Sequence, residues 1–146
     1  MKGKVITIEE TKANKMDMKK CYMRSIFNFC FLETNNVGDV YFSTAEQNKW
    51  EFKKTDIQGA YTIKHINTNL FLTSNEKGDI FSTIDLNSSF QKWFVFNSSE
   101  AETYAYQNVS NGLYFNVSLR DEIYLDQINT NTKRSLINTF QFFPKK

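Results

Sequence analysis

The stretch YTIKHINTNLFLTSNEKGDIFSTIDLNSSFQKWFVF, residues 61–96, carries the pattern that decides the fold. A shift back by 40 residues gives CYMRSIFNFCFLETNNVGDVYFSTAEQNKWEF from Cys21, and a shift forward by 43 gives YAYQNVSNGLYFNVSLRDEIYLDQ from Tyr104. The first 23 positions of the three segments align without a gap. Such a period indicates a chain built from three copies of one unit.

Each unit reads as four short β-strands. In the quoted stretch, YTIKHI and LFLTS are rich in β-branched and aromatic residues, and NEKGD has the composition of a hairpin turn. DIFST and WFVF supply the third and fourth strands. The units close on Trp50, Trp93 and Phe140. Because these aromatic residues recur in phase with the repeat, we expect them to fill the core.

Three four-strand units of about 40 residues each predict an all-β fold of the β-trefoil type. The repeats run over about 21–58, 59–101 and 102–144. A propeller is disfavoured because propellers usually need at least four blades. We expect a single β-trefoil domain over 21–146 and an N-terminal arm over 1–20, which packs loosely or contacts a partner.

Composition limits the classes of function. The net charge of +2 is too small to predict nucleic-acid binding, so no nucleic-acid partner is expected. No apolar run approaches the roughly 18 residues of a membrane span, and the N-terminus lacks the apolar core of a signal peptide. We expect a soluble protein, and the sequence leaves open whether it is secreted without an evident signal peptide or is cytoplasmic.

Catalytic and metal-binding residues are scarce. The chain has two cysteines, Cys21 and Cys30, and one histidine, His65, too few for a four-ligand zinc site, and we expect no metal and no cofactor. The cysteines are interpreted as small buried apolar residues, with a disulfide between them as the alternative. His65 lies in a predicted strand without a nucleophile motif nearby, so we interpret it as a polar strand residue and expect no enzyme activity.

Two groups of aromatic residues are candidates for surface contacts. Alternation along the third strands, with the preceding valine or isoleucine inward, turns three rings outward, where they can stack on sugars or a protein partner unless loops cover them. These rings are Tyr41, Phe81 and Tyr124. In the fourth strand of the second unit, inward Trp93 and Val95 place Phe94 and Phe96 on the other side. Neighbouring exposed apolar residues usually mark an interface, so this strand is predicted to contact a protein.

The closing aromatic residues also carry a family resemblance. Gln91-Lys92-Trp93 matches the Q-x-W motif, and Asn48-Lys49-Trp50 and Asn138-Thr139-Phe140 are progressively weaker matches. Repeated in phase with the unit, this pattern resembles ricin-B-type lectin domains over about residues 21–143. The chain is also similar in texture to the small non-toxic haemagglutinin components of clostridial toxin complexes.

The resemblance implies a carbohydrate-binding, non-enzymatic module whose partners are glycans or a glycoprotein, and a subunit role in a toxin or adhesion complex with a protein partner. A sugar site in that family uses an acidic residue after the second strand, an aromatic ring near the third strand and an amide before the closing aromatic. No unit has the full set, since Ser43, Thr83 and Asp126 stand at the aromatic position. The candidates are Glu33 and Gln47 in the first unit, and Asn116, Asp126 and Asn138 in the third.

Other binding functions stay open. The ending FQFFPKK and the pair Lys133-Arg134 are similar to features of growth-factor and cytokine trefoils, which bind receptors and heparin. A protein-binding scaffold without sugar affinity and a fascin-like actin-binding trefoil are further alternatives. The closing tryptophans and the mild charge favour the lectin type.

Overall fold

The computed structural model describes residues 8–12, 16–45, 48–98, 102–118, 120–127 and 139–144, and for the first and last of these ranges it describes the backbone. The first unit contributes β2 (Lys20–Ser25), β3 (Phe31–Thr34), β4 (Val40–Ser43) and β5 (Trp50–Lys54). The second contributes β6 (Ala60–His65), β7 (Phe71–Ser74), β8 (Ile80–Thr83), the 3-10 helix η1 (Ser89–Gln91) and β9 (Trp93–Ser98). The third contributes β10 (Thr103–Asn108), β11 (Tyr114–Val117), β12 (Ile123–Asp126) and β13 (Thr139–Pro144).

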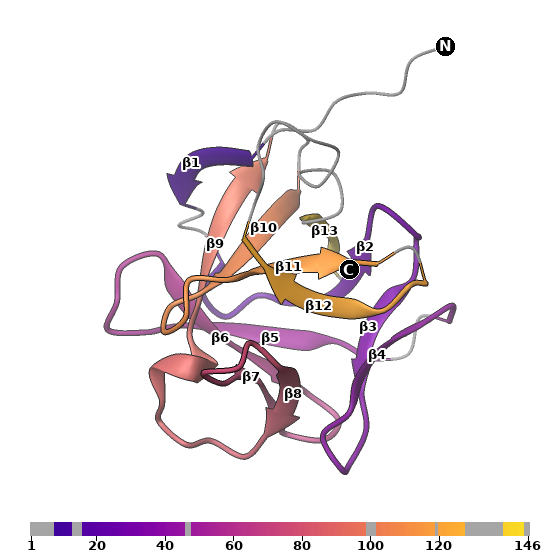
Figure 1. The fold of residues 1–146 in the computed structure, drawn as a ribbon, viewed down its shortest axis with the longest axis horizontal. Helices are drawn as coiled ribbons and strands as arrows, with labels where there is room; N and C mark the ends of the chain where they lie inside the picture. The colour runs from indigo at the N-terminus through magenta and orange to yellow at the C-terminus, as the bar shows by residue number, and fades with distance from the viewer. Residues whose placement is uncertain are drawn as a thin grey trace.

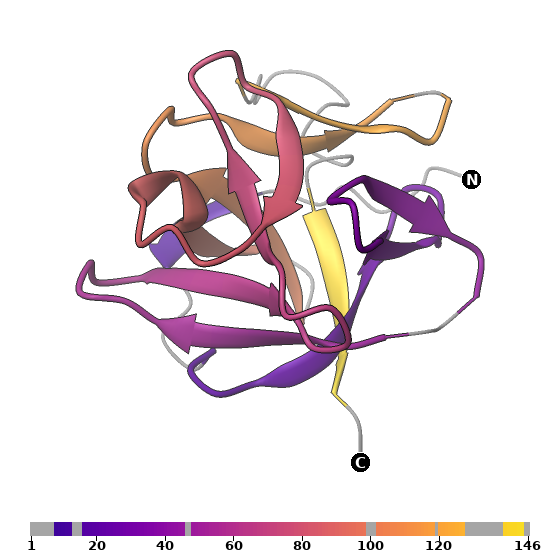
Figure 2. The same ribbon diagram turned by 90° about the horizontal axis from the view of Figure 1, so that it is seen from below.

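The first and fourth strands of the three units form a closed barrel. Each strand of the ring β2-β5-β6-β9-β10-β13 pairs with the next, and β13 pairs back with β2 (Figure 1). The second and third strands form the hairpins β3–β4, β7–β8 and β11–β12, whose later strands β4, β8 and β12 contact one another. Figure 2 shows β13, in yellow, beside β2 as it completes the ring. This arrangement is the predicted β-trefoil.

The two closing tryptophans are the largest fully buried side chains. The Trp50 indole N–H donates to the Leu32 carbonyl at 2.9 Å, and the Trp93 indole N–H donates to the Leu72 carbonyl at 3.0 Å. Each indole therefore ties the fourth strand of its unit to the second strand. The prediction that Trp50 and Trp93 fill the core is confirmed, and the Phe140 side chain lies outside the described residues.

The hairpin turns contain the positive φ angles that the NEKGD pattern predicts. Gly38 and Gly78 have φ angles of 91° and 80°, and Asp121 takes the same position in the third unit at 62°. At Gly38 the need for glycine is also steric, because a Cβ atom would lie 2.4 Å from the Ser82 carbonyl oxygen. The close approach exists because the Ser82 N–H donates to the Gly38 carbonyl at 2.9 Å.

The segment expected to be an N-terminal arm contains a strand and a core residue. The strand β1 (Ile8–Lys12) pairs antiparallel with β9, with Ile8 opposite Ser98 and Lys12 opposite Phe96. Met16 is buried in the core, and the Met18 N–H donates to the Phe52 carbonyl at 2.7 Å. Residues 8–12 and 16–20 are thus integral to the domain, because backbone pairing and core packing hold them against β9 and β5.

The two thiols are free and differ in exposure. Cys21 is fully buried at the start of β2, as expected, whereas Cys30 is half-buried before β3. Burial raises the pKa of Cys21 to about 12. Within the described ranges, no helix has the length and apolar character needed to cross a membrane.

Candidate functional site

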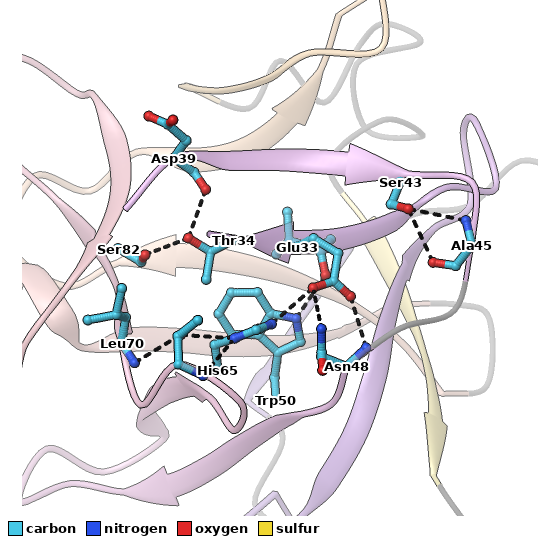
Figure 3. Close-up of polar contacts among 12 residues, drawn as sticks. Glu33, Thr34, Asp39, Ser43, Ala45, Asn48, Trp50, His65, Leu70 and Ser82 are labelled. Atoms are coloured by element: carbon cyan, nitrogen blue, oxygen red, sulfur yellow. Dashed lines mark hydrogen bonds and ion pairs between the residues drawn. The ribbon is translucent and has the colours of Figure 1, made fainter. Parts of the chain in front are cut away.

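Glu33, the predicted acidic ligand of the first unit, is an interior residue with 1% of its surface exposed. Its Oε2 atom accepts the Asn48 backbone N–H at 3.0 Å (Figure 3). Its Oε1 atom accepts the Asn48 Nδ2 group at 3.3 Å and lies 2.9 Å from His65 Nε2. Both carboxylate oxygens are therefore used inside the protein. This position does not suit the predicted contact with a sugar, and indicates that Glu33 anchors the segment before Trp50.

His65 is buried as well, which the interpretation as an ordinary polar strand residue did not anticipate. Its Nδ1 atom accepts a hydrogen bond from the Thr68 N–H at 3.3 Å and lies 2.9 Å from the Thr68 hydroxyl oxygen. Because Nδ1 accepts, the ring proton belongs on Nε2, which donates to Glu33. The imidazole and the Trp50 indole meet edge to face, with their centroids 4.8 Å apart. This pair links the second unit to the first.

In the second unit, the glutamine of the Q-x-W motif anchors the segment before the closing tryptophan, as Glu33 does in the first unit. Gln91 is buried, and its Nε2 group donates to the Ile84 carbonyl at 2.7 Å and to the Thr73 hydroxyl at 3.2 Å. Its Oε1 atom accepts the Leu86 N–H at 2.8 Å. The motif residue therefore fixes the segment 84–92 against β7, and it is buried beneath that segment.

In the third unit the predicted residues lie on paired strands. Asn116 of β11 is fully buried, and its Nδ2 group donates to the Tyr114 carbonyl at 3.2 Å, while its Oδ1 atom finds no donor among the described residues. Asp126 of β12 pairs opposite Tyr114, and its Oδ1 atom accepts the Gln127 N–H at 2.8 Å. The remaining predicted amides, Gln47 and Asn138, lie outside the described residues, as do Lys133 and Arg134.

The three third-strand aromatic residues occupy equivalent places on the three hairpins. Tyr41 is 41% exposed, and Phe81 and Tyr124 are half-buried. They stand directly opposite Glu33, Thr73 and Asn116 in the strand registers. Directly opposite residues share a face of an antiparallel pair, so each ring lies on the same face as the polar residue of its unit.

Phe94 and Phe96 are half-buried, which limits the surface they offer to a protein partner. Their rings are 6.2 Å apart, and the Phe96 ring lies 6.2 Å from that of Tyr114. Along one edge of β9, the strand β1 pairs with it and places Lys12 opposite Phe96. Other parts of the chain therefore cover some of the surface that the sequence assigned to a protein partner.

A polar recess lies where the second unit meets the first, and it consists of two adjoining hollows of about 190 and about 160 Å³ that share Thr62 and Asp85. We call this recess the unit-two hollow. The β5–β6 hairpin forms one wall and the segment 84–92 the other. Its further lining residues are Glu51, Lys53, Thr55, Asp56, Lys64, Phe71, Asn87, Ser88, Gln91 and Lys92. Volumes below the roughly 300–1,000 Å³ of drug-sized clefts suit one sugar residue.

Charges of both signs face the unit-two hollow. The Lys92 ammonium lies 3.0 Å from the Asp56 carboxylate, and this hydrogen bond lowers the pKa of Asp56. Lys64 lies 3.6 Å from Glu51. Asp85 is exposed, and its Oδ1 atom accepts the Asn87 N–H at 2.9 Å, which closes a local turn.

Sequence reasoning did not single out the hollow. The available signal was the loop before the closing aromatic, the one place where the units differ in length. Its lining residues come from two units, and Asp85, Asn87 and Ser88 lie beyond the gap-free alignment of the units, so the search for a shared motif passed over these three. In the part of the chain that the structure describes, no group of three His, Cys, Asp or Glu side chains could hold a metal ion.

Comparison by sequence gives no assignment, since no family model and no curated protein matches the chain. Solved structures do match. The structure of SeviL bound to asialo-GM1 saccharide has a TM-score of 0.71 at 19% identity, covering 88% of this chain and 99% of SeviL. A designed 3-fold symmetric protein, ThreeFoil, has a TM-score of 0.71 at 10% identity over 84% of this chain and 96% of its own.

A third similar structure is a larger enzyme, the GH43 β1,3-galactosidase BT0265. Its TM-score is 0.69 at 19% identity, and the match covers 95% of this chain. The match covers 29% of the galactosidase, so the likeness concerns one part of that protein. Identities this low establish the fold alone. The chain has the β-trefoil fold that the sequence predicts.

Proposed function

We propose that this protein is a non-enzymatic glycan-binding module and that the unit-two hollow holds the sugar. The observation that carries the proposal is the combination of side chains around the hollow: the Asp85 carboxylate, the Asn87 amide, the hydroxyls of Thr62 and Ser88, and the Phe71 ring. Carboxylates and amides bond to sugar hydroxyl groups, and a ring face covers sugar C–H groups.

The binding wall is held in place before a ligand arrives. Gln91 binds the segment at Ile84 and Leu86, and the turn at Asp85 keeps one carboxylate oxygen engaged with Asn87. The second oxygen, Oδ2, is the natural acceptor for a sugar hydroxyl. A pre-ordered wall costs less entropy on binding, so modest contacts suffice.

Binding is favoured over hydrolysis. A glycosidase needs one carboxylic acid whose pKa is raised, so that it can protonate the leaving group. Asp56, which shares the hollow with Asp85, has its pKa lowered by Lys92 and is an unsuitable acid. SeviL, which is similar in fold, is seen with a saccharide bound, which further supports a binding role.

The segment also favours a glycoprotein as the physiological ligand. Ile84 and Leu86, on either side of Asp85, are exposed apolar residues. These two apolar side chains at the rim of the unit-two hollow can pack against the peptide that carries a glycan. The Q-x-W resemblance supports placing the protein among haemagglutinin-type lectins that work within larger assemblies.

Calorimetric titration with asialo-GM1 saccharide tests the proposal. Asp85→Asn keeps the Oδ1 acceptor of the local turn but removes the charge, so affinity should fall about tenfold with the fold intact. Glu76→Gln, on the exposed β7–β8 turn outside the hollow, is the matched control and should bind like the wild type. Equal binding by the Asp85→Asn and wild-type proteins would place the sugar elsewhere.

A further inference from the structure

Two polar side chains on adjacent strands face the unit-two hollow without a partner. Lys53 of β5 stands directly opposite Thr62 of β6, and both line the smaller part of the hollow. Directly opposite residues lie on the same face of an antiparallel pair, with Cβ atoms about 4.5–5.5 Å apart. Neither side chain makes a hydrogen bond or an ion pair in the part of the chain that the structure describes. We call these two residues the polar pair.

The charges around the polar pair are balanced. The smaller part of the hollow is lined by the carboxylates of Glu51 and Asp85 and by the ammonium groups of Lys53 and Lys64. The Lys64 ammonium lies 3.6 Å from the Glu51 carboxylate and is thereby engaged. The Lys53 ammonium remains available as a hydrogen-bond donor, but the two carboxylates beside it disfavour an anion. A neutral acceptor such as a carbonyl oxygen suits this position.

An aromatic ring lies next to the polar pair. Phe71 of β7 stands directly opposite Lys64, which is two positions along β6 from Thr62. Diagonal neighbours of this kind are about 7–8 Å apart, which is within reach of an aromatic side chain. The Phe71 side chain is half-buried and lines the same part of the hollow. An ammonium donor, a hydroxyl group and an apolar ring are therefore gathered around one small volume.

The polar pair is particular to this strand pair. At the same register, β9 and β10 have Phe96 opposite Ala105, and β13 and β2 have Phe143 opposite Tyr22. Apolar or aromatic residues thus stand at the equivalent positions of the other two strand pairs. The shared scaffold does not require a lysine and a threonine here, so the repeat does not explain them.

We propose that Lys53, Thr62 and Phe71 form an acetamido subsite, which recognises the N-acetyl group of an N-acetylhexosamine. The inference rests on the proposed function, since it names the class of sugar that the unit-two hollow holds. The acetamido carbonyl accepts from the Lys53 ammonium, and the amide N–H donates to the Thr62 hydroxyl. The methyl group packs on the Phe71 ring. The sugar ring occupies the larger part of the hollow, which Asp85 and Thr62 connect to the subsite.

The amide fits the subsite better than a charged substituent does. It offers one acceptor, one donor and one methyl group, and the three side chains provide a complement to each. An unacetylated amino sugar would place its ammonium beside that of Lys53. A carboxylate in the same place would lie beside Glu51 and Asp85. Charge therefore selects against both, and leaves the neutral amide.

The test compares methyl N-acetyl-β-galactosaminide with methyl β-galactoside and with methyl β-galactosaminide, and repeats the comparison in the glucose series. NMR titrations of the isotope-labelled full chain measure weak affinities and locate the amides that shift. In at least one series, we expect the N-acetyl glycoside to bind about tenfold more tightly than the other two.

The outcomes separate the subsite from the hollow. Equal affinity for the N-acetyl glycoside and the parent glycoside would overturn the acetamido subsite, while the proposed function would stand. Tighter binding of the free amine would overturn it too, because a cation would then be the preferred ligand. If none of these glycosides binds, the subsite is wrong, and if asialo-GM1 saccharide also fails to bind, so is the proposed function.

Lys53→Met provides the companion variant, because methionine keeps an unbranched apolar side chain but has no ammonium donor. Lys53 is exposed, so the melting temperature should be unchanged. The preference for the N-acetyl glycoside should fall to about twofold or less. Lys54→Met, at the adjacent exposed lysine that lines neither part of the hollow, should keep the full preference. An unaltered preference in Lys53→Met would contradict the subsite.

Discussion

At the scale of single residues, the acidic group that looks most like a sugar ligand serves the fold. Glu33 makes hydrogen bonds with Asn48 and His65, and neither its side chain nor that of His65 reaches solvent. A carboxylate is costly to bury unless it is paired and hydrogen-bonded, and here the partners come from two units. The contact between the first and second units therefore explains why Glu33 is an acidic residue.

Replacing Glu33 with alanine should destabilise the protein by about 3 kcal/mol, because it leaves His65 Nε2 and the Asn48 groups without their buried acceptor. Urea denaturation followed by tryptophan fluorescence measures this loss. Below the unfolding transition, binding to asialo-GM1 saccharide should be unchanged. A small loss of stability together with a large loss of binding would instead assign Glu33 to the sugar site.

The thiols should differ in reactivity because only the thiolate reacts. Burial raises the pKa of Cys21 to about 12, so at pH 8 its thiol stays protonated as well as inaccessible. Burial and the nearby Asp121 carboxylate also raise the pKa of Cys30, but its side chain is half-exposed. Iodoacetamide at pH 8 should modify Cys30 alone in the native protein, and both cysteines in urea, as read by mass spectrometry. Alkylation of Cys21 in the folded protein would contradict its burial.

At the scale of strands and turns, most of the fold can be predicted from the repeat. The quoted stretch predicts strands at YTIKHI, LFLTS, DIFST and WFVF, and β6, β7, β8 and β9 lie within one or two residues of them. The same alternation fails for β1, because Ile8–Lys12 has no counterpart in the other units to reveal its pairing. It also overstates the exposure of Phe94 and Phe96, since alternation gives the side of a strand but not what covers it.

The turns offer a matched pair of substitutions. Gly38 and Gly112 both have positive φ angles, 91° and 74°, but a Cβ atom would lie 2.4 Å from the Ser82 carbonyl at Gly38 and 3.9 Å from the nearest atom, Gln107 Nε2, at Gly112. Gly112→Ala should cost about 1 kcal/mol from backbone strain alone. Gly38→Ala should cost at least about 1 kcal/mol more, because it must also separate the β3–β4 and β7–β8 hairpins. Equal losses of the free energy of unfolding in urea denaturation would show that the two hairpins separate without an energetic penalty.

At the scale of the whole molecule, the positions that repeat in the three units differ in role from those that stand in one unit. The closing tryptophans and hairpin turns recur because three units share one core. Residues 84–88 lie beyond the gap-free alignment of the three units, whereas Gln91 of the same segment belongs to the Q-x-W motif. The repeat revealed the fold, whereas a search for a motif in all three units disregards residues that stand in only one of them, such as those at 84–88.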